Sequence, residues 1–125
     1  MRMLVLGAGL QGSACAYDLL QNRAVTQVTI ADLRPDNLPQ FLEKARDERL
    51  KPVKLDVSDE QSVRGIMQGQ TAVMSAIPYY YNGPMARFAV ESGCHFADLG
   101  GNTEIVMEQK KLHDQAKAKG VSIIP

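Results

Sequence analysis

Hydrophobic and polar positions form two kinds of segment along the chain. Short, nearly unbroken apolar runs, such as residues 71–77, are typical of parallel strands that are buried on both faces. Between these runs lie stretches in which apolar residues recur at the three- and four-residue spacing of a helix with one buried face. Strands and helices are therefore expected to alternate strictly. This alternation predicts an α/β fold with a doubly wound, six-stranded parallel sheet, helices on both faces and the strand order 3-2-1-4-5-6.

Caps and turn residues set the expected boundaries of these elements. After a strand that ends at Asp32, a turn at 35–39 with Asn37 as the N-cap is expected to lead into a helix that runs to about Leu50. The inner face of this helix is predicted to carry Leu38, Phe41, Leu42 and Ala45. A third strand is expected at 52–57, and further strands at 71–77, 95–99 and 121–124. A short helix is expected to begin at the capping box Ser58-x-x-Gln61 and to end at Gly69, with Val63, Ile66 and Met67 facing inward. Another helix is expected from Gly83–Pro84 to Gly93, and one last helix from Asn102 or Thr103 to Gly120.

The first strand leads directly into the pattern Gly7-x-Gly9-x-x-Gly12 at the start of a helix. Gly7 would permit the tight turn, Gly9 would let the backbone approach a pyrophosphate, and Gly12 would allow close packing of the helix on the strand. Asp32 stands 20 residues after Gly12, at the end of the second strand, where its carboxylate could accept hydrogen bonds from two ribose hydroxyls. A glycine turn that only packs does not account for Asp32. The combination therefore indicates a Rossmann domain that binds a dinucleotide.

Ligands of doubly wound sheets bind beyond the carboxyl ends of the strands. The predicted cofactor-binding residues are accordingly those that follow the first five strands: Gly7, Gly9, Leu10, Gln11 and Gly12; Asp32, Leu33 and Arg34; Asp56 and Val57; Ala76, Ile77 and Pro78; and Leu99 and Gly100.

Two of these positions leave alternatives open. Asp32 favours the free 2′-hydroxyl of NAD, since a 2′-phosphate would meet a like charge, whereas Arg34 could hold the phosphate of NADP. We therefore expect NAD, with NADP possible. Asp56 could accept a hydrogen bond from the adenine amine, or it could help to cap the helix that begins beside it.

Three adjacent tyrosines and one further carboxylate lie near the expected nicotinamide end. On an extended segment Tyr79, Tyr80 and Tyr81 would point in opposite directions, so that at least one is expected to face the crevice or a partner, although packing is the more common role. Asp98 is the carboxylate best placed to meet a substrate, but it could equally cap the turn that follows it. No residue is identified as a catalytic acid or base.

Composition excludes several functions. Basic and acidic residues number 14 each, so no net charge favours nucleic acid. No signal peptide precedes the first strand and no apolar run reaches membrane-spanning length, so a cytoplasmic protein without a membrane partner is expected. Cys15 and Cys94 are expected to be small buried residues, and His95 and His113 stand apart from any cluster of ligands, so no metal is predicted.

The chain of 125 residues is long enough for one domain. Its last expected strand is apolar and would form an uncovered sheet edge, which whole proteins usually cover. We therefore expect residues 1–125 to be the N-terminal, dinucleotide-binding part of a longer protein.

The whole chain also resembles the N-terminal NAD(P)-binding domain of the saccharopine dehydrogenase family, especially its lysine 6-dehydrogenase-like members. The stretches that carry the resemblance, in order, are LVLGAGLQG, VTIAD, LDVSD, AIPYYYN, ESGCHFADLGG and GVSIIP. The resemblance implies an NAD(P)-dependent oxidoreductase that acts at an amine carbon of an amino acid and forms an imine, which is then hydrolysed. It also implies a second, substrate-binding domain after Pro125, which would carry much of the substrate pocket and the interface of a homodimer.

Two other functions stay open. A nucleotide-sensing regulatory module, of the kind that gates potassium channels, would show a similar length, glycine motif and acid without substrate chemistry. A Rossmann domain for another adenosine ligand, such as S-adenosylmethionine, is the weaker alternative, because the third glycine argues against it. The three tyrosines and the ADLGG turn favour the dehydrogenase, whose isolated domain would bind the cofactor but turn over nothing.

Overall fold

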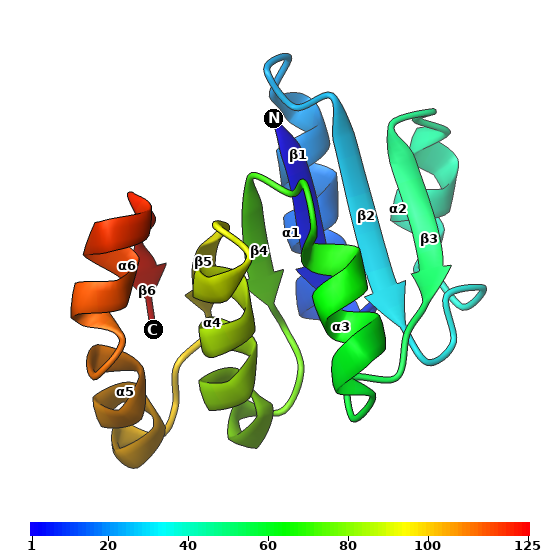
Figure 1. Cartoon of the computed structure of the whole chain (residues 1–125). Coiled ribbons are helices and arrows are strands. Elements are labelled where there is room, and N and C mark those ends of the chain that lie inside the picture. The colour runs from blue at the N-terminus through cyan, green and yellow to red at the C-terminus, as the bar shows by residue number, and fades with distance from the viewer.

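The computed structural model describes residues 1–125 and contains one six-stranded parallel sheet in the order β3-β2-β1-β4-β5-β6, as predicted (Figure 1). The strands are β1 (Arg2–Leu6), β2 (Gln27–Asp32), β3 (Leu50–Lys54), β4 (Ala72–Ser75), β5 (His95–Asp98) and β6 (Ile123–Ile124). The helices are α1 (Leu10–Gln21), α2 (Gln40–Ala45), α3 (Glu60–Met67), α4 (Asn82–Glu91), α5 (Thr103–Lys110) and α6 (His113–Lys119), with a 3-10 turn, η1 (Tyr79–Tyr81), before α4.

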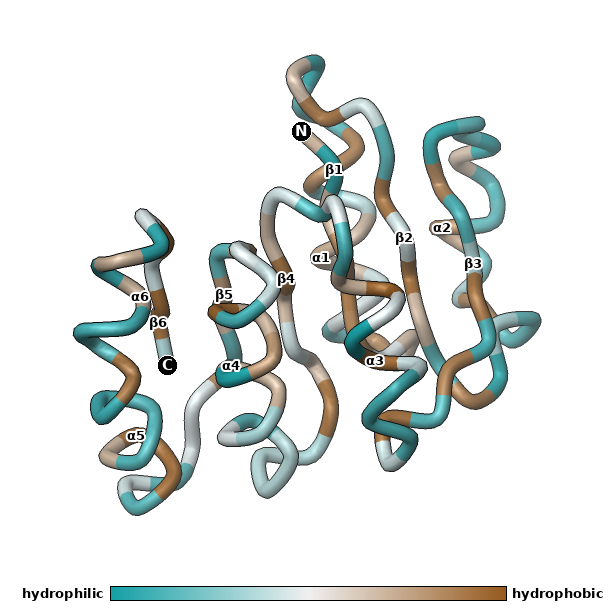
Figure 2. Tube along the Cα trace, in the orientation of Figure 1, coloured by the Kyte–Doolittle hydropathy of each residue, from teal (hydrophilic) through white to brown (hydrophobic).

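Two hydrophobic cores lie on opposite faces of the sheet because successive side chains of a strand point to opposite sides. In β1, Leu4 and Leu6 belong to the larger core, whereas Val5 belongs to the smaller one. The larger core packs β1, β4 and β5 against α3 and α4, and the smaller core packs β1 and β2 against α1 and α2. The helices of the domain alternate hydrophilic and hydrophobic positions, as α3, α5 and α6 show in Figure 2.

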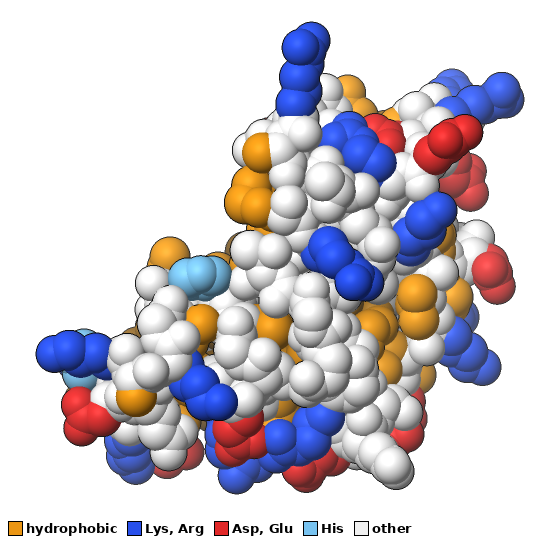
Figure 3. Space-filling model, turned by 45° about the horizontal axis from the view of Figure 1, so that its top comes forward, with side chains coloured by type: hydrophobic (Ala, Val, Ile, Leu, Met, Phe, Trp, Pro, Cys, Tyr) orange, Lys and Arg blue, Asp and Glu red, His pale blue; other side chains and the backbone are white.

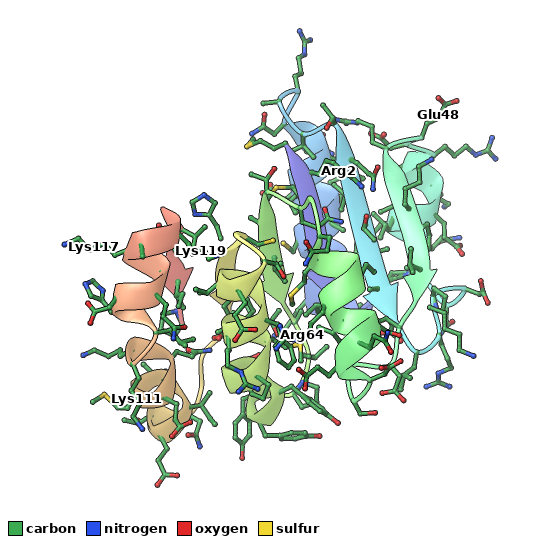
Figure 4. All side chains as sticks on the ribbon, viewed as in Figure 1. Arg2, Glu48, Arg64, Lys111, Lys117 and Lys119 are labelled. Atoms are coloured by element: carbon green, nitrogen blue, oxygen red, sulfur yellow. The ribbon has the colours of Figure 1, made fainter.

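Charged side chains hold neighbouring helices together at the surface. Arg64 of α3 bonds to Glu60 of the same helix at 2.8 Å and reaches Glu91 of α4, and its guanidinium lies 4.3 Å from the ring centre of Phe88 (Figure 4). Cationic and anionic groups are interspersed on the face shown in Figure 3, without a patch of one sign. None of the helices combines the length and the apolar character that crossing a bilayer requires.

The helix that was predicted to run to about Leu50 is shorter in the structure, where it is α2. α2 ends at Ala45, Arg46 adopts a left-handed conformation with φ 45°, and β3 begins at Leu50 rather than at 52 and ends at Lys54 rather than at 57. The reason lies in Arg49, whose side chain donates to the carboxylate of Asp47 and to carbonyl oxygens of the last turn of α1 and of the loop before β2, including that of Val25 at 2.9 Å. These bonds hold residues 46–49 in a turn that a continuing helix would break.

The predicted inner face of that helix is only partly right. Leu42 is buried and Leu38 packs against the smaller core. Phe41, in contrast, is 42% exposed and makes an edge contact with the ring of Tyr17 instead. Ala45 is exposed because the helix ends there.

Other details also differ from the prediction. The strands expected at 71–77 and 121–124 are shorter, since β4 spans only Ala72–Ser75 and β6 only Ile123–Ile124. The N-cap of α3 is Asp59, not Ser58, because the Asp59 carboxylate accepts a hydrogen bond from the amide of Ser62. The single last helix is in fact two, since the chain turns at Lys111–Leu112, where Leu112 packs against the larger core. The tyrosines form the 3-10 turn η1 rather than an extended segment.

Candidate functional site

The three glycines of the loop after β1 have different surroundings. Gly7 has φ +97°, and a Cβ atom added there would lie 2.7 Å from the carbonyl oxygen of Ala76. A Cβ atom at Gly12 would overlap the carbonyl oxygen of Gly7. At Gly9, by contrast, no atom lies within 4 Å of the position that a Cβ would take. Gly7 and Gly12 are therefore required by the packing of the protein itself, whereas Gly9 leaves space open to a ligand.

The amino end of α1 faces that space. Gly9 is the N-cap, no side chain caps the helix, and no acidic residue lies in its first turn. The first amides of a helix lack partners within the helix, and together with the helix dipole they attract an anion. Leu10 and Gln11, which carry two of these amides, are exposed. Ser13 ties the first turn of α1 to the glycine loop, because its hydroxyl donates a hydrogen bond to the carbonyl oxygen of Ala8 at 2.9 Å.

Asp32 is tied to the glycine loop by its side chain. Its Oδ2 accepts a hydrogen bond from the amide of Ala8 at 2.8 Å, and its Oδ1 accepts one from the amide of Arg34 at 2.9 Å. A carboxylate has further lone pairs beyond these two bonds, so that the group can still accept hydroxyl donors. The side chains of Leu33 and Arg34 are exposed beside it.

Lys54 is a neighbour of Asp32 that the sequence analysis missed. The pairing of β2 with β3 sets Lys54 directly opposite Asp32, and the Lys54 side chain is exposed. The end of the third strand was predicted three residues later, which hid this position. Asp32 is thus flanked by two exposed cations, Arg34 and Lys54.

Asp56 and Val57 follow β3 in a turn. The carboxylate of Asp56 accepts hydrogen bonds from the hydroxyl of Ser58 at 2.6 Å and from its amide at 2.9 Å, and these bonds hold the pKa of Asp56 below its ordinary value. Val57 packs against the larger core. Asp56 therefore serves the turn before α3, while the cap of that helix is Asp59.

The segment after β4 lies against the glycine loop. The amide of Ala76 donates to the carbonyl oxygen of Leu6 at 2.8 Å, Ile77 packs against the larger core, and Pro78 is exposed. Below this segment the hydroxyl of Ser75 donates to Oδ1 of Asn82 at 2.7 Å, and both side chains are buried. This bond fixes the start of α4 to the end of β4.

The tyrosines divide between two environments. Tyr81 packs against the larger core, whereas Tyr79 and Tyr80 are 49% and 57% exposed. The rings of Tyr79 and Tyr80 meet edge to face with their centres 5.7 Å apart. Since they follow β4, they lie at the same edge of the sheet as the other predicted residues.

Asp98 supports the loop between β5 and α5. Its Oδ1 accepts a hydrogen bond from the amide of Gly100, and its Oδ2 accepts one from the side-chain amide of Gln109, each at 2.6 Å. Gly100 has φ +65°, which suits a glycine in this turn, and Leu99 is 53% exposed. Of the two interpretations of Asp98, the structure favours the turn. Gln109 carries no signal in the sequence, because an isolated glutamine in a helix is ordinarily a surface residue.

The structure thus joins some predicted positions and leaves others apart. The glycine loop, Asp32 and Ala76 are in direct contact, where the strand order reverses between β1 and β4. Asp56 and Gly100 follow β3 and β5 at the same edge of the sheet, but no hydrogen bond connects them to the loop. A further groove lies elsewhere, between β6 and the α5–α6 pair. It is lined by helix and strand residues away from the glycine loop, and we do not assign the cofactor to it.

Neither cysteine belongs to a reactive site. Burial raises the pKa of both thiols, and Cys94 donates to the carbonyl oxygen of Met67 at 3.1 Å. Cys15, on α1, is half-buried. No group of three or more His, Cys, Asp or Glu side chains is placed to hold a metal ion.

Comparison with solved structures shows the same fold in several proteins. Saccharopine dehydrogenase (L-Glu forming) from Saccharomyces cerevisiae has a TM-score of 0.77 and 20% identity over 98% of this chain, which corresponds to 26% of that protein. A Rossmann-fold NAD(P)-binding family protein from Shigella flexneri has a TM-score of 0.67 and 15% identity, with 98% of this chain and 64% of that chain covered. GenD2 from gentamicin A biosynthesis, solved in complex with NAD, has a TM-score of 0.65 and 20% identity, with 99% and 33% covered.

The chain spans about a quarter to two thirds of the length of these three proteins. The family model described as the saccharopine dehydrogenase NADP binding domain matches residues 3–124, nearly the whole chain. This match confirms both the family resemblance and the NAD(P) cofactor that the glycine motif and Asp32 predicted. The chain belongs to the family of saccharopine dehydrogenase NADP-binding domains, a family of oxidoreductase cofactor domains with the Rossmann fold.

Proposed function

We propose that this chain is the cofactor-binding domain of an amino-acid oxidoreductase of the saccharopine or lysine dehydrogenase type, in which a hydride is transferred at an amine carbon. The observation that carries the proposal is the open space at Gly9, beside the uncapped amino end of α1, with Asp32 bonded to the same loop. A pyrophosphate needs this combination of free amides and absent Cβ, and a ribose needs the adjacent carboxylate. The residues present therefore fit a dinucleotide.

Most of the predicted positions have a proposed role in direct contact with the cofactor. The amides of Leu10, Gln11 and Gly12 would hold the pyrophosphate, and Asp32 would accept from the adenosine ribose. Asp56 and Val57 would flank the adenine. Ala76, Ile77, Pro78, Leu99 and Gly100 would line the nicotinamide side. When bound, NAD(P) supplies the hydride acceptor or donor.

The rest of the enzyme is part of the proposal. We propose that a substrate-binding domain and a homodimer interface lie beyond Pro125, and that the isolated chain binds cofactor without turnover. In support, the yeast saccharopine dehydrogenase is almost four times as long as the part that this chain covers. Hydride transfer depends on a substrate held against the nicotinamide, which requires residues outside this domain. A cytoplasmic location stays a prediction from the sequence.

The preferred cofactor is proposed to be NAD. The carboxylate of Asp32 is held in place by two backbone amides, so it cannot swing away from an incoming 2′-phosphate without breaking both bonds. Arg34 and Lys54 oppose this preference, because either cation could pair with the phosphate.

Calorimetric titration of the chain with NADH and with NADPH tests both the proposed binding of a dinucleotide and the proposed preference for NAD. We expect saturable binding of both nucleotides, with the higher affinity for NADH. We expect Arg34→Ala to lower the affinity for NADPH and to leave the affinity for NADH unchanged. Tighter NADPH binding would reverse the cofactor preference but keep the cofactor domain. Absence of binding to either nucleotide would contradict the proposed function. Because a regulatory module would also bind nucleotide, lysine- or saccharopine-dependent reduction of NAD(P) by a full-length protein distinguishes the enzyme from the module.

A further inference from the structure

Gln109, on α5, is an unusual residue for a buried position. Its side chain is only 2% exposed, yet its Oε1 has no hydrogen-bond partner. Buried polar atoms are normally paired, and an apolar side chain such as leucine would fill the same space without leaving an acceptor unpaired. Packing alone therefore does not explain a glutamine at this position.

The orientation of the Gln109 amide follows from its partner. The Asp98 carboxylate only accepts hydrogen bonds, so the nitrogen of the amide must face it, and the observed distance from Nε2 to Oδ2 is 2.6 Å. The oxygen is left unpaired as a result. A hydrogen bond to a charged acceptor is stronger than one between neutral groups, so the bond to Asp98 is the main polar contact of the Gln109 side chain.

Asp98 transmits this contact to the loop at 98–102. Its other oxygen accepts from the amide of Gly100, and Gly100 and Gly101 have φ values of +65° and +104°. Asn102 holds the far end of the loop, where its side chain accepts from the amide of Ile105 as the cap of α5. The hydrogen bonds of Asp98 and Asn102 are local, whereas Gln109 reaches the loop from the opposite end of α5. The loop is thus fastened to α5 by one long-range side-chain bond.

The same loop forms one wall of the proposed nicotinamide side. Asp98, Gly100 and Gln109 border a narrow gap together with Tyr79 and Asn82, which follow β4. The glycine loop, Asp32 and Asp56 follow β1, β2 and β3, on the other half of the sheet. A shift of the loop at 98–102 would therefore alter the nicotinamide side and leave the ADP side in place.

We propose that Gln109 is a positioning residue for the nicotinamide half of the cofactor, which it fixes through Asp98 and the turn at Leu99–Gly100. This inference rests on the proposed function. Its distinctive consequence is a different effect on two ligands. A change at Gln109 lowers the affinity for NADH, which occupies both the ADP side and the nicotinamide side of the site. It leaves the affinity for ADP-ribose unchanged, because that ligand occupies only the ADP side. A merely structural role would weaken both ligands together or neither.

The experiment compares the affinities of NADH and ADP-ribose for four forms of the chain. In Gln109→Glu two carboxylates face each other, and we expect NADH affinity to fall roughly tenfold with ADP-ribose unchanged, since one hydrogen bond to a charged group is lost. The double variant Asp98→Asn with Gln109→Glu exchanges the amide and the carboxylate and can restore both bonds. We expect it to recover NADH affinity.

The matched control is Gln70→Leu. Gln70 is also a buried glutamine with an unpaired Oε1, 8% exposed, but it bonds to the carbonyl oxygen of Ile66 and lies before β4, at the amino edge of the sheet. Its substitution should leave both affinities unchanged. Three outcomes would each overturn the inference alone. In the first, Gln109→Glu loses affinity for NADH and ADP-ribose in parallel; in the second, it binds both as tightly as the original chain does. In the third, the double variant fails to recover NADH binding. If the unaltered chain binds neither ligand, the proposed function fails and the inference with it.

Discussion

Gly9→Ala separates the stability of the glycine loop from its capacity to bind. Gly9 has φ −66° and ψ −176°, which an alanine adopts without strain, and no atom lies within 4 Å of the new methyl group. Alanine is the poorer N-cap, at a cost of about 0.5–1 kcal/mol, whereas it restricts the unfolded chain and stabilises by about 0.4–1 kcal/mol. These two effects oppose each other. We therefore expect the free energy of unfolding to change by less than about 1 kcal/mol.

The effect on the cofactor is expected to be much larger. The methyl group would fill the space through which a pyrophosphate approaches the amides at the start of α1. We expect the affinity for NADH to fall at least about a hundredfold, which corresponds to about 2.8 kcal/mol. Urea denaturation followed by circular dichroism measures the stability, and calorimetric titration measures the affinity.

Two other glycines provide the comparison for this experiment. Gly65→Ala, in the exposed part of α3 with nothing within 4 Å, should stabilise by about 0.5–1 kcal/mol and leave binding unchanged. Gly12→Ala should destabilise strongly, because the new Cβ meets the backbone of Gly7 rather than a movable side chain. Unchanged NADH binding by Gly9→Ala, or a loss of stability as large as its loss of binding, would refute the reasoning.

Three further predictions concern the framework that holds the site. Phe96→Ala should lower the free energy of unfolding by about 3–5 kcal/mol in urea denaturation, since the ring is 1% exposed, while Phe41→Ala, at 42% exposure, should lower it far less; equal effects would contradict the assigned core. Arg49→Ala should lower the melting temperature, because the carbonyl oxygens of Asn22 and Val25, in the loop between α1 and β2, lose their donor; an unchanged melting temperature would show that these bonds are not needed. Hydrogen bonds from the hydroxyl and then the amide of Ser62 lower the pKa of Asp59, so its contribution to stability is present above the ordinary carboxyl pKa and is lost as the pH falls through the lowered value. Asp59→Asn should remove that part of the acid dependence, which melting curves between neutral and acidic pH would detect.

The sequence predicted the features that depend on local pattern. The strand order, the glycine loop and the position of Asp32 follow from hydrophobic periodicity and from motif spacing, and the structure has all three. The sequence also narrowed the N-cap of the last helix to Asn102 or Thr103, and the structure has Asn102, whose side-chain oxygen accepts a hydrogen bond from the backbone amide of Ile105.

The features that were missed depend on contacts between distant residues. α2 ends early because Arg49 bonds to carbonyl oxygens more than 20 residues earlier in the chain. The last helix breaks at Leu112 because that side chain packs into the larger core. Likewise, the partner of Gln109 is Asp98, 11 residues away on another element. Periodicity and cap signals contain no information about such partners.

The place of β1 has a consequence for the order in which the domain can assemble during synthesis. The first strand of this sheet to be synthesised is a central one, with β2 on one side and β4 on the other. β1, α1 and β2 can pair as soon as residues 2–32 are made, but Met3 must wait for Ala72, its partner in β4. The 69 residues that follow Met3, up to and including Ala72, take roughly 3–14 s to synthesise at about 5–20 residues per second. During that interval Leu4 and Leu6 have no partners from β4 or α4, so this face of β1 has only the part of the larger core that β2 and α3 supply.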